Sequence, residues 1–107
     1  MEFNELRTKV KKIGFKEVRF DKEEFFEGFI PIEKLPNLIS VLESFFGPPA
    51  IPSAQEVSAE AQKVANEFGG VWKGQSFYFQ LKETRPMFAM LWPWADKAHV
   101  TLKLGHK

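Results

Sequence analysis

The sequence contains no cysteine, which excludes disulfides, thiolate metal sites and thiol catalysis together. It also lacks a charge excess, because 15 Lys and Arg stand against 14 Asp and Glu, so no overall field draws the chain to nucleic acid or anionic lipid. No apolar run is long enough to span a membrane, and the first residues are charged rather than typical of a signal peptide. These absences predict a soluble, cytoplasmic protein without a membrane partner.

Motifs of catalytic and cofactor sites are missing as well. Gly69, Gly70 and Gly74 precede predicted strands, so they offer no helix N-terminus to a phosphate. The two histidines, His99 and His106, do not have the spacing of metal ligands, and no serine or threonine lies in a nucleophile elbow. We therefore predict no metal, no cofactor and no catalytic residue, and a non-enzymatic protein is favoured.

Aromatic residues are abundant. Twelve Phe, three Trp and one Tyr supply much of the apolar area that the core of a 107-residue chain needs. This length fits one core and is too short for two independent ones, so residues 1–107 are expected to form a single domain.

Three segments are predicted to be helices. Residues 3–13 and 32–46 carry apolar side chains at intervals of three and four, and each segment ends at a glycine. A third helix is expected over 53–68, with Ser53 as its N-cap and Glu56 as its capping-box partner. Its apolar stripe consists mostly of small residues, so this helix is expected to lie close against a sheet.

The remaining segments favour strands. Residues 15–20 and 25–30 are predicted to form a hairpin with a turn at 21–24, although Asp21 could instead N-cap a short helix with Glu24 as its capping-box partner. Residues 71–75 suit a short strand or bulge. Residues 76–82, 86–92 and 98–104 have short connections, which favour a three-stranded antiparallel meander.

These elements predict an α+β fold. We expect an antiparallel sheet of about four to five strands, built from the N-terminal hairpin and the C-terminal meander, with two to three helices packed mainly on one face.

The segment from Pro86 to Trp94 is apolar at every position between Pro86 and Pro93. A half-exposed strand alternates apolar and polar residues, so this pattern predicts a strand that is covered on both faces. The second face is covered either by this chain or by a partner.

The two faces of the meander are assigned from the alternation of its strands. Phe77, Phe79 and Leu81 are expected to face the helices together with Val100, Leu102 and Leu104. Small Ala89 would accommodate a helix, so the middle strand is expected to turn Met87, Ala89 and Leu91 toward the helices and Phe88, Met90 and Trp92 away from them.

The opposite face would then resemble a binding surface, with aromatic residues and a polar, basic rim. Its candidate binding residues are Tyr78, Phe88, Met90, Trp92, Lys82, His99 and Lys103. An open face could form a homodimer or bind a small partner. The alternative is that the first helix or the hairpin covers it.

The leading functional prediction is a non-enzymatic binding or protein-interaction module that uses this aromatic face. One alternative is binding of single-stranded nucleic acid or a nucleotide by stacking on Tyr78, Phe88 and Trp92. Nucleic acid is the less favoured partner, because six cations against two anions from residue 71 onward is a small excess for such a domain. A second alternative is a small enzyme with a site near His99.

Residues 88–104 run from an apolar strand through a turn to the sequence His99-Val100-Thr101-Leu102. In this respect they are similar to small bacterial domains of the YjbR or YdhG-like kind. The resemblance covers fewer than a fifth of the residues, and no function is transferred from it.

Overall fold

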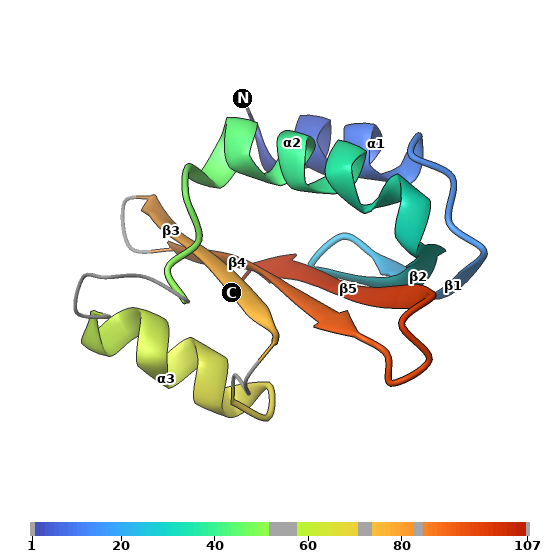
Figure 1. The fold of residues 1–107 in the computed structure, drawn as a ribbon. Coiled ribbons are helices and arrows are strands. Elements are labelled where there is room, and N and C mark those ends of the chain that lie inside the picture. The colour runs from blue at the N-terminus through green and yellow to red at the C-terminus, as the bar shows by residue number, and fades with distance from the viewer. Residues whose placement is uncertain (1, 52–57, 71–73, 83–84, 107) are drawn as a thin grey trace.

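The computed structural model describes residues 2–51, 58–70, 74–82 and 85–106. Its sheet has five strands in the order β1-β2-β5-β4-β3, and all neighbouring strands are antiparallel (Figure 1). In chain order the elements are α1 (Phe3–Lys11), β1 (Glu17–Lys22), β2 (Phe25–Pro31), the 3-10 helix η1 (Ile32–Lys34), α2 (Leu35–Phe46), α3 (Ala59–Glu67), β3 (Ser76–Lys82), β4 (Arg85–Pro93) and β5 (His99–His106).

The predicted α+β fold is confirmed, and so are its two pieces of sheet. β1 and β2 form the N-terminal hairpin, and β3, β4 and β5 form the meander. The alternative helix beginning at Asp21 is wrong, because Asp21 lies in β1 and pairs with Phe26 of β2. The two pieces join where β2 pairs with β5, in the register that places Phe26 opposite Leu104.

Helices α1 and α2 lie on the same face of the sheet (Figure 1). α1 buries Leu6 and Val10, and α2 buries Leu38 and Leu42, which are the positions that the apolar periodicity indicates. Gly14 has a φ of 96°, a left-handed conformation that glycine adopts without strain, and the chain reverses there after α1.

Helix α3 lies on the opposite face, beside β3 and β4 (Figure 1). Its N-cap is Ser58, whose side chain accepts a hydrogen bond of 3.2 Å from the backbone N–H of Ala61. The predicted capping box of Ser53 and Glu56 lies outside the described residues, as does most of the predicted strand over 71–75.

β4 is covered on both faces, as its unbroken apolar sequence predicts. Every residue from Met87 to Leu91 is at most 3% exposed. One face of the sheet belongs to a first core with α1 and α2, and the other to a smaller second core with α3. The buried side chains of the first core are Leu6, Val10, Phe26, Ile30, Leu38, Leu42, Tyr78, Ala89, Leu91, Val100, Leu102 and Leu104. Those of the second are Ala61, Val64, Ala65, Phe77, Phe88 and Met90.

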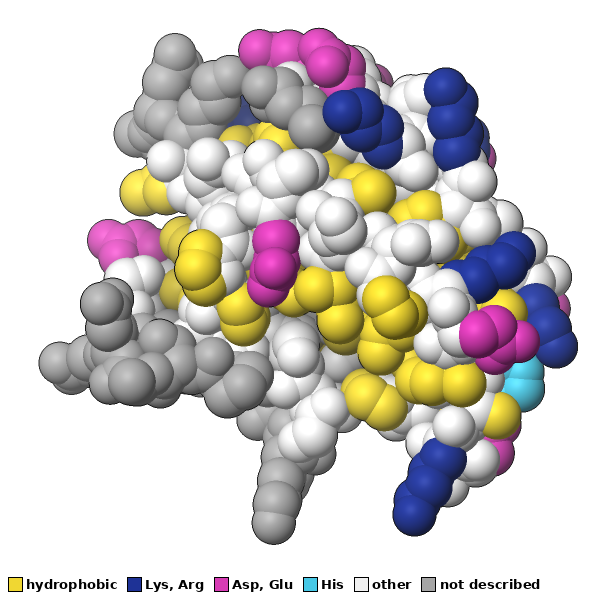
Figure 2. Space-filling view, turned by 45° about the horizontal axis from the view of Figure 1, so that its top comes forward, with side chains coloured by type: hydrophobic (Ala, Val, Ile, Leu, Met, Phe, Trp, Pro, Cys, Tyr) yellow, Lys and Arg dark blue, Asp and Glu magenta, His cyan; other side chains and the backbone are white. Residues whose placement is uncertain are grey.

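Hydrophobic side chains border the first core on the side of α1 and α2. Figure 2, with this side tilted forward, shows a band of hydrophobic side chains among scattered acidic and basic ones. Partly buried residues that pack against this core include Leu35, Ile39, Val41, Phe45 and Phe46 of α2. We interpret these α2 side chains as the margin of a packed core.

The predicted orientation of β3 is wrong. Phe77 and Phe79 lie toward α3, whereas Tyr78 lies in the first core, with its ring centroid 6.0 Å from that of Phe46. Because helices pack on both faces at this end of the sheet, neither alternate set of β3 side chains has to be polar. The orientations predicted for β4 and β5 are confirmed, since Ala89, Leu91 and the apolar residues of β5 face α1 and α2.

The predicted cover of the second face also needs correction. Neither the hairpin nor α1 lies over Phe88 and Met90; α3 does. The hairpin extends the sheet sideways, because β2 pairs edge to edge with β5. α3 therefore covers the β3–β4 part of this face.

Candidate interaction surface

Among the described residues, α3 reaches the β1–β2–β5 part of the second face only at one corner, where Phe25 of β2 stacks on Phe68, the C-cap of α3, with ring centroids 5.9 Å apart. No described helix lies over the rest of this part of the sheet (Figure 1). Strand alternation decides which side chains project there, because Phe26, Gly28 and Ile30 of β2 are buried toward the first core and their neighbours point the other way. We call this surface the open face. Its side chains are Glu17, Arg19, Phe20, Glu27, Phe29, Trp94, His99, Thr101 and Lys103.

The structure places the binding residues predicted from the sequence in three different environments: the first core, the second core and the open face with its border. Tyr78 is 2% exposed in the first core, and burial raises the pKa of its hydroxyl above 10.0, with a smaller contribution from Glu43. Phe88 and Met90 are buried in the second core. Lys82 lies in β3, and its side chain is outside the described set.

Trp92, His99 and Lys103 are the predicted residues that meet at or beside the open face. Trp92 is half-buried where the second core borders this surface. The Lys103 ammonium lies 3.7 Å from the centroid of the Trp92 ring, in a cation–π contact.

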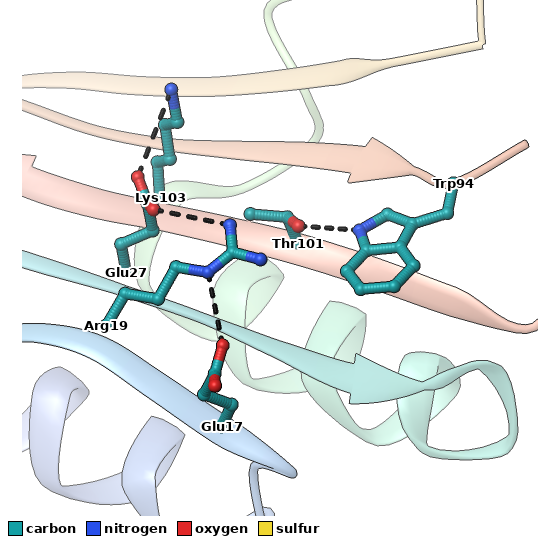
Figure 3. A network of polar contacts seen from close by, with 6 residues as sticks. All are labelled: Glu17, Arg19, Glu27, Trp94, Thr101 and Lys103. Atoms are coloured by element: carbon teal, nitrogen blue, oxygen red, sulfur yellow. Dashed lines mark hydrogen bonds and ion pairs between the residues drawn. The ribbon is translucent and has the colours of Figure 1, made fainter.

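Four charged side chains form a row across the open face (Figure 3). Arg19 Nε lies 3.3 Å from Glu17 Oε2, and Arg19 Nη1 lies 3.7 Å from Glu27 Oε2. Lys103 Nζ lies 4.0 Å from Glu27 Oε1. The row crosses from β1 over β2 to β5, and its charges alternate as negative, positive, negative, positive. We call these four residues the charge row; its formal charges sum to zero.

Aromatic rings pack beside the charge row. The centroid of the Trp94 ring lies 4.6 Å from that of Phe29 and 4.8 Å from that of His99. Trp94 Nε1 donates a 2.7 Å hydrogen bond to Thr101 Oγ1 (Figure 3), and Thr101 is only 5% exposed. Arg19 covers the Phe29 ring, with its guanidinium carbon 5.7 Å from the ring centroid. Phe20 of β1, at 48% exposed, is the most open ring of this surface.

The one histidine of the open face is held by the turn that precedes β5. Asp96 Oδ1 accepts hydrogen bonds from the backbone N–H groups of Ala98 (2.8 Å) and His99 (3.2 Å), and Asp96 Oδ2 lies 2.7 Å from His99 Nδ1. The Ala98 N–H, followed by the His99 side chain, lowers the pKa of the Asp96 carboxyl below 3.8. Lys97 in the same turn has a φ of 59°.

A carboxylate beside a histidine can also orient that histidine as a general base. Here the carboxylate caps the turn as well, and the Thr101 hydroxyl on the same strand already accepts a bond from Trp94. The pair is thus accounted for by the structure of the turn.

Sequence reasoning did not place six members of this surface there: Glu17, Arg19, Phe20, Glu27, Phe29 and Trp94. The pairing of β2 with β5, which brings them together, joins segments far apart in the sequence. One signal was present: within 25–30 the charged Glu27 alternates with Phe26 and Gly28, so its side chain points away from the first core, to the side of β2 over which no described helix lies.

Within the part of the chain that the structure describes, no helix is long and apolar enough to cross a membrane. The same part contains no cluster of three or more His, Asp or Glu side chains that could hold a metal ion. Comparison of the chain with protein-family models, with curated proteins and with solved structures finds no match, so the resemblance of residues 88–104 to the YjbR or YdhG-like domains gains no support.

Proposed function

We propose that the protein is a non-enzymatic self-association module that binds a second copy of itself through the open face. The observation that carries this proposal is the uneven cover of the sheet: α3 packs over β3 and β4, while none of the helices that the structure describes lies over the aromatic surface on β1, β2 and β5. Such a surface, with rings beside charged groups, has the composition of a protein interface.

The charges of this surface favour a protein over a nucleic acid. A phosphate backbone is bound by an excess of cations, whereas the charge row has two of each sign. Base stacking also needs free ring faces, and the faces of Trp92 and Phe29 are already in contact with Lys103 and Arg19.

The test is the mass of the protein in solution over a wide range of concentration, measured by light scattering and sedimentation. We expect the mass to rise from monomer to dimer, and we expect Phe20→Glu to abolish this rise because it places a charge at the most open ring of the surface. Leu81→Glu is the matched control, since Leu81 is also 48% exposed but lies on β3, at the other edge of the sheet.

A wild-type protein that stays monomeric at the highest concentration would refute the proposal, and so would equal effects of the two substitutions. Titration with a short single-stranded oligonucleotide at low salt tests the competing function. Binding that weakens steeply with salt and is lost in Lys103→Gln would favour nucleic acid over self-association.

A further inference from the structure

We infer that the two copies meet about a twofold axis that reverses the charge row, so that Glu17 of each copy faces Lys103 of the other. This inference rests on the proposed self-association and adds its register. It follows from the order of the four charges across the strands, which Figure 3 shows from Glu17 through Arg19 and Glu27 to Lys103.

A row of four alternating charges is complementary to its own reversed image. A twofold axis that lies in the interface, between Arg19 and Glu27, turns the second row end for end and lays it on the first. Glu17 then meets Lys103, and Arg19 meets Glu27, so every facing pair has opposite signs. Two rows facing in the same direction would bring four pairs of like charges together.

The burial of the row supports this register. The Glu27 and Lys103 side chains are 13% and 19% exposed, so the protein already fixes their positions. Glu17 and Arg19 are 57% and 45% exposed and can reach across an interface. Each predicted contact joins one side chain that is already fixed in the monomer, Glu27 or Lys103, to one exposed side chain, Arg19 or Glu17. Only one long side chain per contact therefore loses conformational entropy when the dimer forms.

The outer edge of β1 offers a competing mode, in which two copies join strand to strand. It is less suitable, because the register of β1 shifts between Val18 and Phe20 and the strand carries charged residues at Glu17, Arg19, Asp21 and Lys22. Irregularity and charge are features that prevent edge strands from pairing.

The test reverses one end of the row at a time. Glu17→Lys alone and Lys103→Glu alone each create two like-charge contacts in a twofold dimer, and we expect the Kd of either homodimer to rise at least about tenfold. An equimolar mixture of the two variants restores both contacts, and so does the double variant. We therefore expect the mixture and the double variant to dimerise with a Kd within about threefold of wild type. Lys9→Glu on α1 changes the net charge as Lys103→Glu does; it is the control for that variant and should leave the Kd of the homodimer unchanged.

Salt gives a readout that does not depend on the folding of Lys103→Glu. Screening weakens attraction and repulsion alike, so added salt should raise the Kd of the wild type and lower the Kd of Glu17→Lys. The register is overturned if the mixture associates no better than its components, or if both proteins respond to salt with the same sign. Those results would leave the proposed function standing provided that the wild type dimerises and Phe20→Glu does not; a monomeric wild type would refute the self-association itself.

Discussion

Substitution of Gly28 by alanine should destabilise the fold, because the backbone of β1, which pairs with β2 here, lies too close to Gly28 to leave room for a Cβ atom. A Cβ at this position would lie 2.6 Å from the backbone oxygen of Glu17, 2.8 Å from Phe15 Cδ2 and 3.3 Å from Val18 Cα. The Phe15 ring could rotate away, but the Glu17 oxygen belongs to a strand that pairs with β2. Relief therefore requires β1 itself to move.

Two opposing effects set the size of the change. Overpacking of this kind costs about 1–3 kcal/mol. The opposing effect is that alanine lowers the conformational entropy of the unfolded chain, which stabilises the fold by about 0.4–1 kcal/mol. This gain applies in full because the φ of Gly28 is not positive, so alanine can adopt it without strain. The two ranges leave a net loss of roughly 0–2.6 kcal/mol in the free energy of unfolding, and we expect the upper half of it, above about 1 kcal/mol, because the closest atom is a backbone oxygen that cannot rotate away. Because the movement displaces Glu17 at one end of the charge row, self-association should weaken as well.

Urea unfolding followed by tryptophan fluorescence, at a protein concentration low enough to keep the chain monomeric, measures this loss. Gly105→Ala is the matched comparison on β5: its Cβ would lie 3.0 Å from the Glu24 oxygen and from two atoms of the Phe88 ring, so the overlap is smaller. We expect the loss for Gly28→Ala to exceed the loss for Gly105→Ala. The opposite order, or a Gly28→Ala protein as stable as the wild type, would refute the reasoning.

Three further predictions concern named groups. Burial raises the pKa of Tyr78, the single tyrosine, so tyrosinate absorbance should appear above pH 10.0 and stability should fall there, because the unfolded chain ionises first. The ion pair with Lys11 lowers the pKa of Asp21 below 3.8; its stabilising effect should be present above pH 3.8 and disappear as the pH falls through the lowered value, and Lys11→Gln should raise that pKa in an NMR titration. Thr101→Val removes the acceptor of the Trp94 hydrogen bond and should cost about 0.5–1.5 kcal/mol in thermal unfolding.

The sequence predicts most elements of this fold because their patterns are local. The alternation of β5 puts His99 and Lys103 on one face of the strand and Val100 and Leu102 on the other. Because one face is polar, the sequence alone predicts correctly which face meets α1 and α2. The unbroken apolar run of β4 likewise predicted cover on both faces.

The misassigned parts depend on contacts that the local pattern does not contain. On β3, Phe77 and Tyr78 are both apolar enough to be buried, so alternation alone could not decide which of them meets α3. The stripe of small residues on α3 indicates that this helix packs closely against the sheet, but it does not indicate which face of the sheet the helix covers. The charge row was missed because Glu27 and Lys103 become neighbours only through the pairing of β2 with β5.

The same pairing has a consequence for the order of assembly. The β1–β2 hairpin and the β3–β4–β5 meander each join segments that are close in the sequence, so each can form early with little loss of loop entropy. β2 can meet β5 only after the intervening chain has closed, and this docking step also completes the first core, since Phe26 and Ile30 then lie beside Leu104 and Val100. During synthesis on the ribosome, the hairpin can therefore dock onto the rest of the sheet only after β5, the last of the five strands in the sequence, has emerged.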